Sequence, residues 1–592
     1  MKKIYLIGLI VIMLVFVRCT DDFENINVDK HEFTNVEPEY LMSSVVKSSM
    51  NLLSELNANV YWQYSHHLTV SGMGSTASYG ASYSSINSWW RQFYETISLL
   101  RQIQKKYGEN EQYKNRVQIA KIWESYMFYI FTTTFGGVPY TYAGRDDLIE
   151  IPFDKENDIY KSILDVLKIA SEELDTEADK LIPDILFEDS DINKWKQLAV
   201  ALRLKIALET QNAIPHEAEM HGKDVMNNFQ DLLIKSNQEN IKFKWGGTNT
   251  SEYSYYYNTY LLNSNKDLPA LSHVMFLYYR SYGDPRMGAI FNKTEGQFLV
   301  FDSLYTDRTY TEKKLYRYQV PYNGKEKTTQ KADLGENDGY VEEVADPYRS
   351  MNPTQYSYLK KDYLRESATQ NLIWYADICF MQAEAKLLNW GGQKTVEQYY
   401  YDGVRASFDY FGLAINQADN YLNQPGIKWN TDKADALPDH RMLINSNIPN
   451  DPLHKIIVQR WLAGIFYGSH DAYCYIRRTR KIELLPHFAP STDAAGAGTR
   501  IANMPERLQY PNSEITYNNK AYKEAVKNLN GGFDFLSTYL NLSREYNRKT
   551  YDEWRVVNLR INNRAWIKWY GETELDLIEA GLVENETYFI EQ

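Results

Sequence analysis

Apolar residues recur with the period of an α-helix in three well-separated segments, and this pattern constrains the fold more than any other feature of the sequence. In residues 117–131 the apolar side chains are spaced three and four positions apart, and segments 191–210 and 373–387 repeat that spacing. Such a stripe gives each helix one face to bury. Further helices are expected at about 38–57, 86–106, 156–174, 395–411 and 452–467. The sequence therefore predicts a mainly α fold.

The ends of two of these helices carry recognisable signals. Asp191 directly precedes the second periodic segment and is placed to cap its N-terminus. Gly391 and Gly392 follow the third segment and predict a glycine C-cap there.

The helical pattern is interrupted between about residues 240 and 360. This loop-rich insert contains Gly-Gly and Asn-Gly turns, clustered tyrosines and short alternating pieces such as GQFLVFD (296–302), which reads as a strand. Two shorter loop-rich regions cover about 415–450 and 483–515. We expect a helical scaffold with a few short strands and long loops, and binding function tends to sit on such loops.

The first eighteen residues are organised as an export signal. Lysines precede an apolar stretch of about 14 residues, Ile4 to Val17, which is shorter than the ~20 residues that span a bilayer. Cys19 follows at the position where bacterial lipoproteins carry an acylated cysteine, and acidic residues come next. We expect residues 1–18 to be removed, Cys19 to be lipidated and residues 19–36 to form an acidic tether.

Charge and cysteine content exclude several classes of function. The net charge is −13, and removing the three basic residues of the leader (−13 − 3) leaves −16, which disfavours nucleic acid as a partner. Beyond Cys19 only Cys379 and Cys474 remain, and we expect free packed thiols. His66 and His67 are adjacent, which suits ordinary hydrogen-bonded histidines better than a metal site. No cofactor or metal is expected.

Catalytic signals are weak. The sequence contains no nucleotide-binding glycine loop, HExxH zinc motif, EF-hand or GxSxG elbow. Asp377 and Glu384 are acids in an apolar helical segment, and seven residues of helical rise separate them by ~10 Å. That separation exceeds the ~6.5–9.5 Å between the carboxyl groups of inverting glycosidases. Side chains could close the gap, so a glycoside hydrolase using this pair is an alternative. The other interpretation makes Glu384 a buried structural acid paired with an arginine or with backbone amides. The candidate arginines are Arg405, Arg460 and Arg478.

Aromatic residues give the strongest hint of binding. They make up 14 % of the chain, with 49 Tyr and 13 Trp, and they cluster in loops beside asparagines. Tyrosine and tryptophan offer a flat apolar face with a polar edge, which suits sugar rings and also peptides. On this chemistry we nominate as ligand-binding residues Trp62, Tyr79, Tyr83, Trp245, Tyr255, Tyr256, Tyr257 and Tyr356.

Segments resembling one protein family recur in order through most of the chain. They are CTDDFENIN (19–27), FGGVPY (135–140), DINKWKQLAVALRLKIAL (191–208), GDPRM (283–287), YADICFMQAEAKLLNWG (375–391), YYDGVRASFDYFG (400–412), IIVQRWLAGIFYGSHDAYCYIRRT (456–479) and PERLQYPNSEITYN (505–518). With the cysteine ahead of them, the chain resembles the SusD/RagB family of nutrient-binding outer-membrane lipoproteins. The resemblance implies tetratricopeptide-like helix pairs that support a loop-built ligand face.

The same resemblance implies a non-enzymatic function. A SusD-like protein captures glycans, or in some members peptides, and delivers them to a SusC-like TonB-dependent outer-membrane transporter. Acylated Cys19 would then hold the chain in the lipid of the outer membrane, facing the exterior. One SusD-like domain is expected over residues 37–592. Its tail, from about 535 to 592, departs from the family, whose members usually end soon after the segment matching 505–535.

Overall fold

The computed structural model describes residues 37–70, 81–145, 147–262, 268–293, 298–301, 314–318, 357–424, 426–429, 450–484, 491–492, 500–501, 504–546 and 588–591. The predicted export signal, Cys19 and the tether lie outside the described residues, as do Tyr79 and Tyr356.

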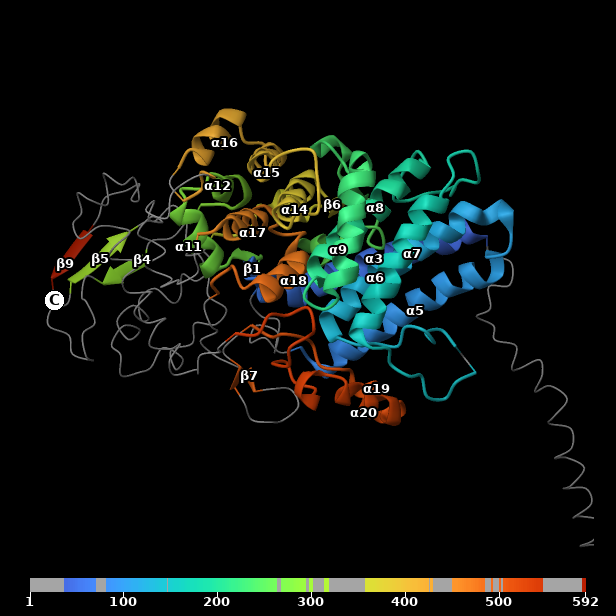
Figure 1. Cartoon of the computed structure of the whole chain (residues 1–592). Helices are drawn as coiled ribbons and strands as arrows, with labels where there is room; N and C mark the ends of the chain where they lie inside the picture. The colour runs from blue at the N-terminus through green and yellow to red at the C-terminus, as the bar shows by residue number, and fades with distance from the viewer. Residues whose placement is uncertain are drawn as a thin grey trace, which may run out of the picture.

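Six helices from the first part of the chain form one half of the scaffold (Figure 1). Each packs on the next, so that the series runs α3 on α5, α5 on α6, and on to α9. On α5 the buried residues recur every three or four positions along one side, as the sequence pattern requires. These helices are α3 (Pro38–Leu56), α5 (Tyr83–Tyr107), α6 (Lys114–Phe135), α7 (Glu156–Glu173), α8 (Ile192–Thr210) and α9 (Pro215–Asp224).

The second half of the scaffold uses helices from beyond residue 374. α14 packs on both α15 and α17, and α18 contacts α8, which joins the two halves. The predicted helix 452–467 is shorter than expected, because the chain turns after Ala463 and Phe466 adopts a positive φ of 79°. The helices are α14 (Tyr375–Leu387), α15 (Val396–Tyr410), α16 (Ile415–Leu422), α17 (Pro452–Ala463) and α18 (Ser469–Thr479).

Helix ends confirm one sequence prediction and correct another. The side chain of Asp191 accepts a hydrogen bond from the Asn193 N–H and caps α8, as expected. At the end of α14 the left-handed residue is Asn389 (φ 61°), not the glycine that we predicted. The N–H groups of Asn389 and Trp390 donate to the carbonyls of Lys386 and Ala385, which is a Schellman motif, and asparagine tolerates the left-handed conformation it needs.

The strands are short and antiparallel. β1 (Leu68–Thr69) pairs with β3 (Ala270–Leu271), β2 (Ile241–Lys244) with β6 (Thr369–Ile373), and β7 (Ser491–Thr492) with β8 (Arg500–Ile501). The strand predicted within GQFLVFD is β4 (Phe298–Phe301).

A three-stranded sheet joins the insert to the end of the chain. β5 (Lys314–Tyr318) lies between β4 and β9 (Tyr588–Glu591), with Leu315 opposite Ile590. The last residues of the atypical tail therefore return to the insert, at the opposite end of the molecule from α5 (Figure 1).

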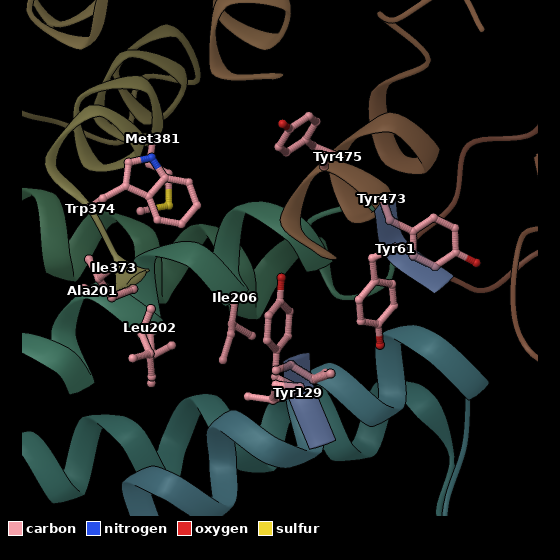
Figure 2. Packing of buried hydrophobic residues seen from close by; sticks show 14 of the residues in the cluster. Tyr61, Tyr129, Ala201, Leu202, Ile206, Ile373, Trp374, Met381, Tyr473 and Tyr475 are labelled. Carbon is pink, nitrogen blue, oxygen red and sulfur yellow. The ribbon is translucent and has the colours of Figure 1, made fainter. Parts of the chain in front are cut away.

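The hydrophobic core runs between the two halves of the scaffold. Figure 2 shows core side chains from both halves: Tyr61, Tyr129 and Ile206 from the first, and Met381 of α14 and Tyr473 of α18 from the second. Several of the largest side chains are fully buried, and burial of each aromatic side chain of this size stabilises the fold by ~2–3 kcal/mol. They include Trp62, Trp89, Trp123, Trp195 and Trp461.

Candidate functional site

Three of the nominated aromatic residues belong to the core. Trp62, Trp245 and Tyr256 are 0 %, 3 % and 1 % exposed. The Trp62 ring stacks on Tyr256 at 5.3 Å between centroids and packs on Phe466 at 5.2 Å, and its Nε1–H donates to the Phe466 carbonyl at 2.8 Å. No face of these rings reaches solvent, so we assign all three to packing and do not retain them as ligand contacts.

Tyr255 and Tyr257 lie on the outside of the same turn. They flank buried Tyr256 in α10 (Tyr255–Tyr257), where successive residues point in different directions, and both are half-buried. The ring of Tyr257 packs edge-on against half-buried Tyr253 at 5.1 Å between centroids. The hydroxyl of Tyr255 accepts a hydrogen bond from the Asn59 amide at 3.1 Å. These tyrosines therefore present fixed rings with polar edges.

A second segment is held against this turn. Ser254 donates its hydroxyl to the carbonyl of Arg365 at 2.8 Å and its N–H to the carbonyl of Glu366 at 2.9 Å. Half-buried Tyr363 packs on the ring of Phe466 at 6.0 Å, beside the buried Tyr256. We call the half-buried rings that result the tyrosine surface; they are Tyr253, Tyr255, Tyr257 and Tyr363.

Polar groups surround these rings. The carboxylate of Glu366 accepts a hydrogen bond from the Tyr257 hydroxyl, which raises the pKa of that tyrosine. Exposed Arg365 forms an ion pair with Asp362 at 2.7 Å. Rings supported from below and ringed by carboxylates, a guanidinium and amides can take a sugar by stacking its apolar face and bonding its hydroxyl groups.

Tyr83 stands apart from this surface. It is the first residue of α5 and is half-buried, and Ser82 caps the helix beside it by accepting a hydrogen bond from the Ser85 N–H. The nomination of Tyr83 stays a prediction, as do those of Tyr79 and Tyr356. The sequence analysis did not nominate Tyr253 or Tyr363. Tyr253 lies two residues before the nominated Tyr255, whereas nothing in the sequence distinguishes Tyr363.

Asp377 and Glu384, the acids of the enzyme alternative, lie in a buried ionic network rather than in a cleft. Glu384 is 1 % exposed, and its carboxylate accepts two hydrogen bonds from the Arg478 guanidinium. Asp377 is equally buried and accepts from Arg460 at 2.6 Å. The interpretation of Glu384 as a buried acid paired with an arginine is confirmed, and Arg478 is the partner.

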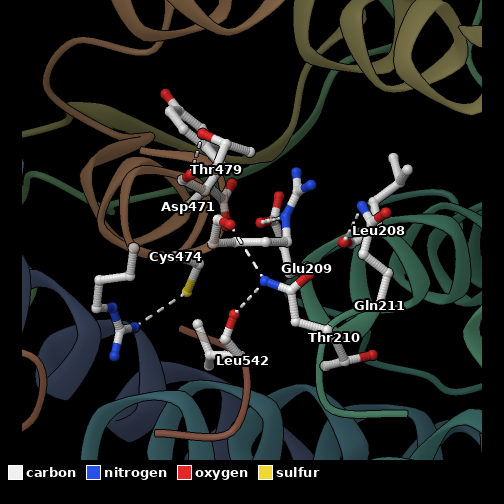
Figure 3. A network of polar contacts seen from close by, with 12 residues as sticks. Leu208, Glu209, Thr210, Gln211, Asp471, Cys474, Thr479 and Leu542 are labelled. Atoms are coloured by element: carbon white, nitrogen blue, oxygen red, sulfur yellow. Dashed lines mark hydrogen bonds and ion pairs between the residues drawn. The ribbon is translucent and has the colours of Figure 1, made fainter. Parts of the chain in front are cut away.

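The network joins four helices. Glu209 of α8 accepts hydrogen bonds from Arg460 of α17 and Arg478 of α18 at 2.8 and 3.1 Å, and Figure 3 shows it between the helices near Asp471. Lys205 donates to Asp471 at 2.5 Å. Burial alone would lower the pKa of Lys205, but the nearby Asp471 and Asp377 carboxylates raise it instead. Each buried charge named in this network thus has at least one partner of opposite charge.

The buried histidine His67 and the two cysteines are also held inside the protein. His67 contacts the Ser469 hydroxyl at 2.7 Å and the Trp461 carbonyl at 3.0 Å, and burial lowers its pKa to about 3. Cys379 and Cys474 are free, buried thiols, as predicted. Across the residues that the structure describes, no group of three His, Cys, Asp or Glu side chains is arranged to hold a metal ion.

None of the helices in the described part of the chain is both long enough and apolar enough to cross a bilayer.

Comparison with known proteins gives one family and one fold. Residues 30–511 match the protein family SusD-like_2, described as "Starch-binding associating with outer membrane". No curated protein matches the sequence.

Solved structures agree with the fold. A SusD homolog from Parabacteroides distasonis superimposes with a TM-score of 0.66 at 19 % identity, covering 87 % of this chain and 99 % of its own. A SusD-like protein from Bacteroides thetaiotaomicron gives 0.63 at 18 % identity, over 86 % and 99 % of the two chains. A chitin-binding SusD homolog from Flavobacterium johnsoniae gives 0.64 at 18 % identity, with the same coverage. The prediction of a mainly α, tetratricopeptide-like scaffold is confirmed.

Proposed function

This chain belongs to the SusD-like family, and from that membership we propose that it is a non-catalytic protein that captures glycans at the surface of the outer membrane. The observation that carries the proposal is the match of residues 30–511 to a family described as starch-binding and associated with the outer membrane. Two of the structural relatives are described as chitin-binding. Polymers of neutral hexose units are therefore the first ligands to consider.

The tyrosine surface is the part of the described chain best suited to that ligand. Its rings are half-buried, so each is fixed by neighbours on one side and offers apolar area on the other. The buried rings of Tyr256 and Phe466 pack against Tyr255 and Tyr363, respectively. Because these two surface rings are already held in place, little conformational entropy is lost there when a sugar binds.

The location and the partner form the second part of the proposal. Cys19 directly follows an apolar leader, and its acylation would anchor the chain to outer-membrane lipid. The captured glycan would then be delivered to a SusC-like TonB-dependent transporter. Residues 37–592 would act as one ligand-binding domain.

Isothermal titration calorimetry of the mature chain without Cys19, beginning at residue 20, tests the binding function. We would titrate maltoheptaose, chitohexaose and a mixed peptide pool, and assay the glycan samples for new reducing ends. Saturable binding of one glycan without product supports the proposal. Binding of peptides alone would replace the ligand class, and release of reducing ends would contradict the non-catalytic assignment.

Co-purification tests the delivery step. A tagged full-length chain would be extracted from membranes in mild detergent, with Cys19→Ala as the matched control that cannot be acylated. We expect an outer-membrane barrel to accompany the native chain. If no barrel is recovered with a chain that is nevertheless present at the outer membrane, the transporter partner is wrong.

A further inference from the structure

A cleft of about 220 Å³ opens where the start of α7 meets the segment that follows α20 (Asn519–Lys527). Its walls combine two half-buried aromatic rings with a group of asparagine amides. None of these residues belongs to the tyrosine surface. The side chains on which the following inference rests are Phe153, Asn157, Asn528, Asn530, Tyr539 and Asn541.

Hydrogen bonds fix the amides in place before any ligand arrives. The Asn541 amide donates to the Oδ1 of Asn157 at 2.9 Å, and the Asn530 amide donates to the Oδ1 of Asn541 at 3.2 Å. Asn530 also donates to the carbonyl of Tyr539 at 2.8 Å, and the Asn541 N–H donates to buried Glu156 at 2.9 Å. The wall is therefore preorganised, which reduces the entropy cost of binding.

Part of the hydrogen-bonding capacity of this wall is unused. The side chain of Asn528 is the exception to this fixing, because within the described residues it makes no hydrogen bond. The Oδ1 of Asn530 likewise accepts none there, although both residues line the cleft. Both side chains are exposed. They provide an amide donor and two carbonyl acceptors for a ligand that carries hydroxyl groups.

The aromatic rings supply the apolar component. Phe153 is held by Tyr510, edge to face at 5.1 Å, and by Trp90 at 6.1 Å, and it remains half-buried. Tyr539 is fixed on another side of the cleft, with the Arg480 guanidinium 5.7 Å from its ring centroid. A ring face next to free amides matches a pyranose, which has an apolar C–H face and a rim of hydroxyl groups.

Charge and size limit the ligand further. The charged residues that line the cleft are two acids, Asp154 and Glu156, and one cation, Lys155. The Asp154 carboxylate already accepts hydrogen bonds from the N–H groups of Tyr140 and Thr141. An anionic sugar would meet carboxylates without a compensating pair of cations. The volume lies below the ~300–1,000 Å³ of pockets for drug-sized ligands, so the cleft suits a single sugar unit.

We propose that the cleft between Phe153, Asn528 and Asn530 is a second sugar-binding subsite, which takes one neutral pyranose unit of a glycan. The subsite is separate from the tyrosine surface, and its existence does not depend on whether that surface binds the same polymer.

Saturation-transfer NMR on the mature chain tests the subsite with small probes. The probes are methyl β-D-glucopyranoside, the methyl glycoside of N-acetylglucosamine, and glucuronic acid as the anionic control. We expect transfer to at least one neutral glycoside and at least tenfold weaker binding after Asn528→Trp, which fills the cleft from an exposed position. The control is Asn420→Trp at an exposed asparagine of α16, which should leave binding unchanged.

The outcomes separate this inference from the proposed function. Two sites are supported if Asn528→Trp loses binding of the small glycoside and Tyr257→Ala, in a separate measurement, loses affinity for the polymer. No transfer to either neutral glycoside, or transfer that Asn528→Trp leaves intact, overturns the subsite while leaving polymer capture to be judged by calorimetry. A native circular dichroism spectrum of Asn528→Trp ensures that loss of binding is not loss of fold.

Discussion

The guanidinium of Arg478 forms two parallel hydrogen bonds with the carboxylate of Glu384, at nitrogen–oxygen distances of 2.6 and 3.0 Å. Both side chains are almost completely buried, so each charge loses its hydration and is stabilised by its partner instead. Removing one partner of such a pair leaves an uncompensated charge inside the protein.

Glu384→Gln should therefore lower the free energy of unfolding by about 3–5 kcal/mol. Urea denaturation followed by circular dichroism measures the change. The control is Glu524→Gln, which removes an exposed carboxylate paired with Lys527 and should cost less than about 1 kcal/mol. Equal effects of the two substitutions would contradict the structural role of Glu384.

Acid should destabilise the protein through His67. Burial lowers the pKa of folded His67 to about 3, whereas an unfolded histidine titrates near 6.5. Below pH 6.5 the unfolded chain binds a proton that the folded chain excludes, so stability falls by about 1.4 kcal/mol per pH unit between pH 6.5 and 3.

Comparison of unfolding at pH 7.5 and 5.0 isolates this contribution. His67→Gln should reduce the stability lost between the two pH values by about 2 kcal/mol, because glutamine does not titrate. The same substitution at exposed His216 serves as the control. If His67→Gln retains the full native loss, another group causes the acid sensitivity.

Neighbouring tyrosines should respond oppositely to truncation. Tyr256 is 1 % exposed and packs on Trp62 and Phe466, so Tyr256→Ala should destabilise the fold by about 3–5 kcal/mol. Tyr257→Ala should leave stability nearly unchanged and weaken glycan binding about tenfold, or ~1.4 kcal/mol. Thermal unfolding and calorimetry on both variants check this, and a Tyr257→Ala chain with native affinity would remove Tyr257 from the site.

Removal of the tail should uncover a strand edge without unfolding the scaffold. A chain ending at residue 546 lacks β9, which leaves one side of β5 unpaired. We expect native helical content, faster amide exchange at residues 314–318 and more self-association in sedimentation velocity. Ile590→Pro in the full-length chain should speed exchange in the same strand, because proline cannot donate to the ladder. Unchanged exchange in both variants would show that β9 does not protect β5.

The scaffold could be predicted from the sequence because the spacing of apolar residues within each helix indicates which face is buried. The apolar period of 191–210 is a local signal that does not depend on which helices lie next to it. The cap formed by Asp191 is local as well, because it acts at the end of its own helix. Side-chain pairs between distant segments have no comparable pattern in the sequence. The sequence indicated that Glu384 is a buried acid with an arginine or backbone amides as its partner. The choice of Arg478 depends on how the helices α14 and α18 lie in the fold.

The binding residues were harder to predict for the same reason. The sequence alone does not distinguish Tyr255, Tyr256 and Tyr257. In the structure, one helical turn directs the middle ring into the core and the other two outward. The asparagine-lined cleft was missed altogether. Asn157 and Asn541 are 384 residues apart in the sequence. Asparagines are common in loops, so nothing in the sequence indicates that these two lie together.

The buried ionic network also bears on how such a protein can change its ligand during evolution. Glu209, Arg460 and Arg478 share hydrogen bonds across three helices, so a substitution at one of them is tolerated only with matching changes at the others. Tyr253 and Tyr257 touch none of these groups and can be exchanged one at a time. If the tyrosine surface binds the ligand as proposed, substitutions there can change the ligand while the buried charges of the scaffold stay the same.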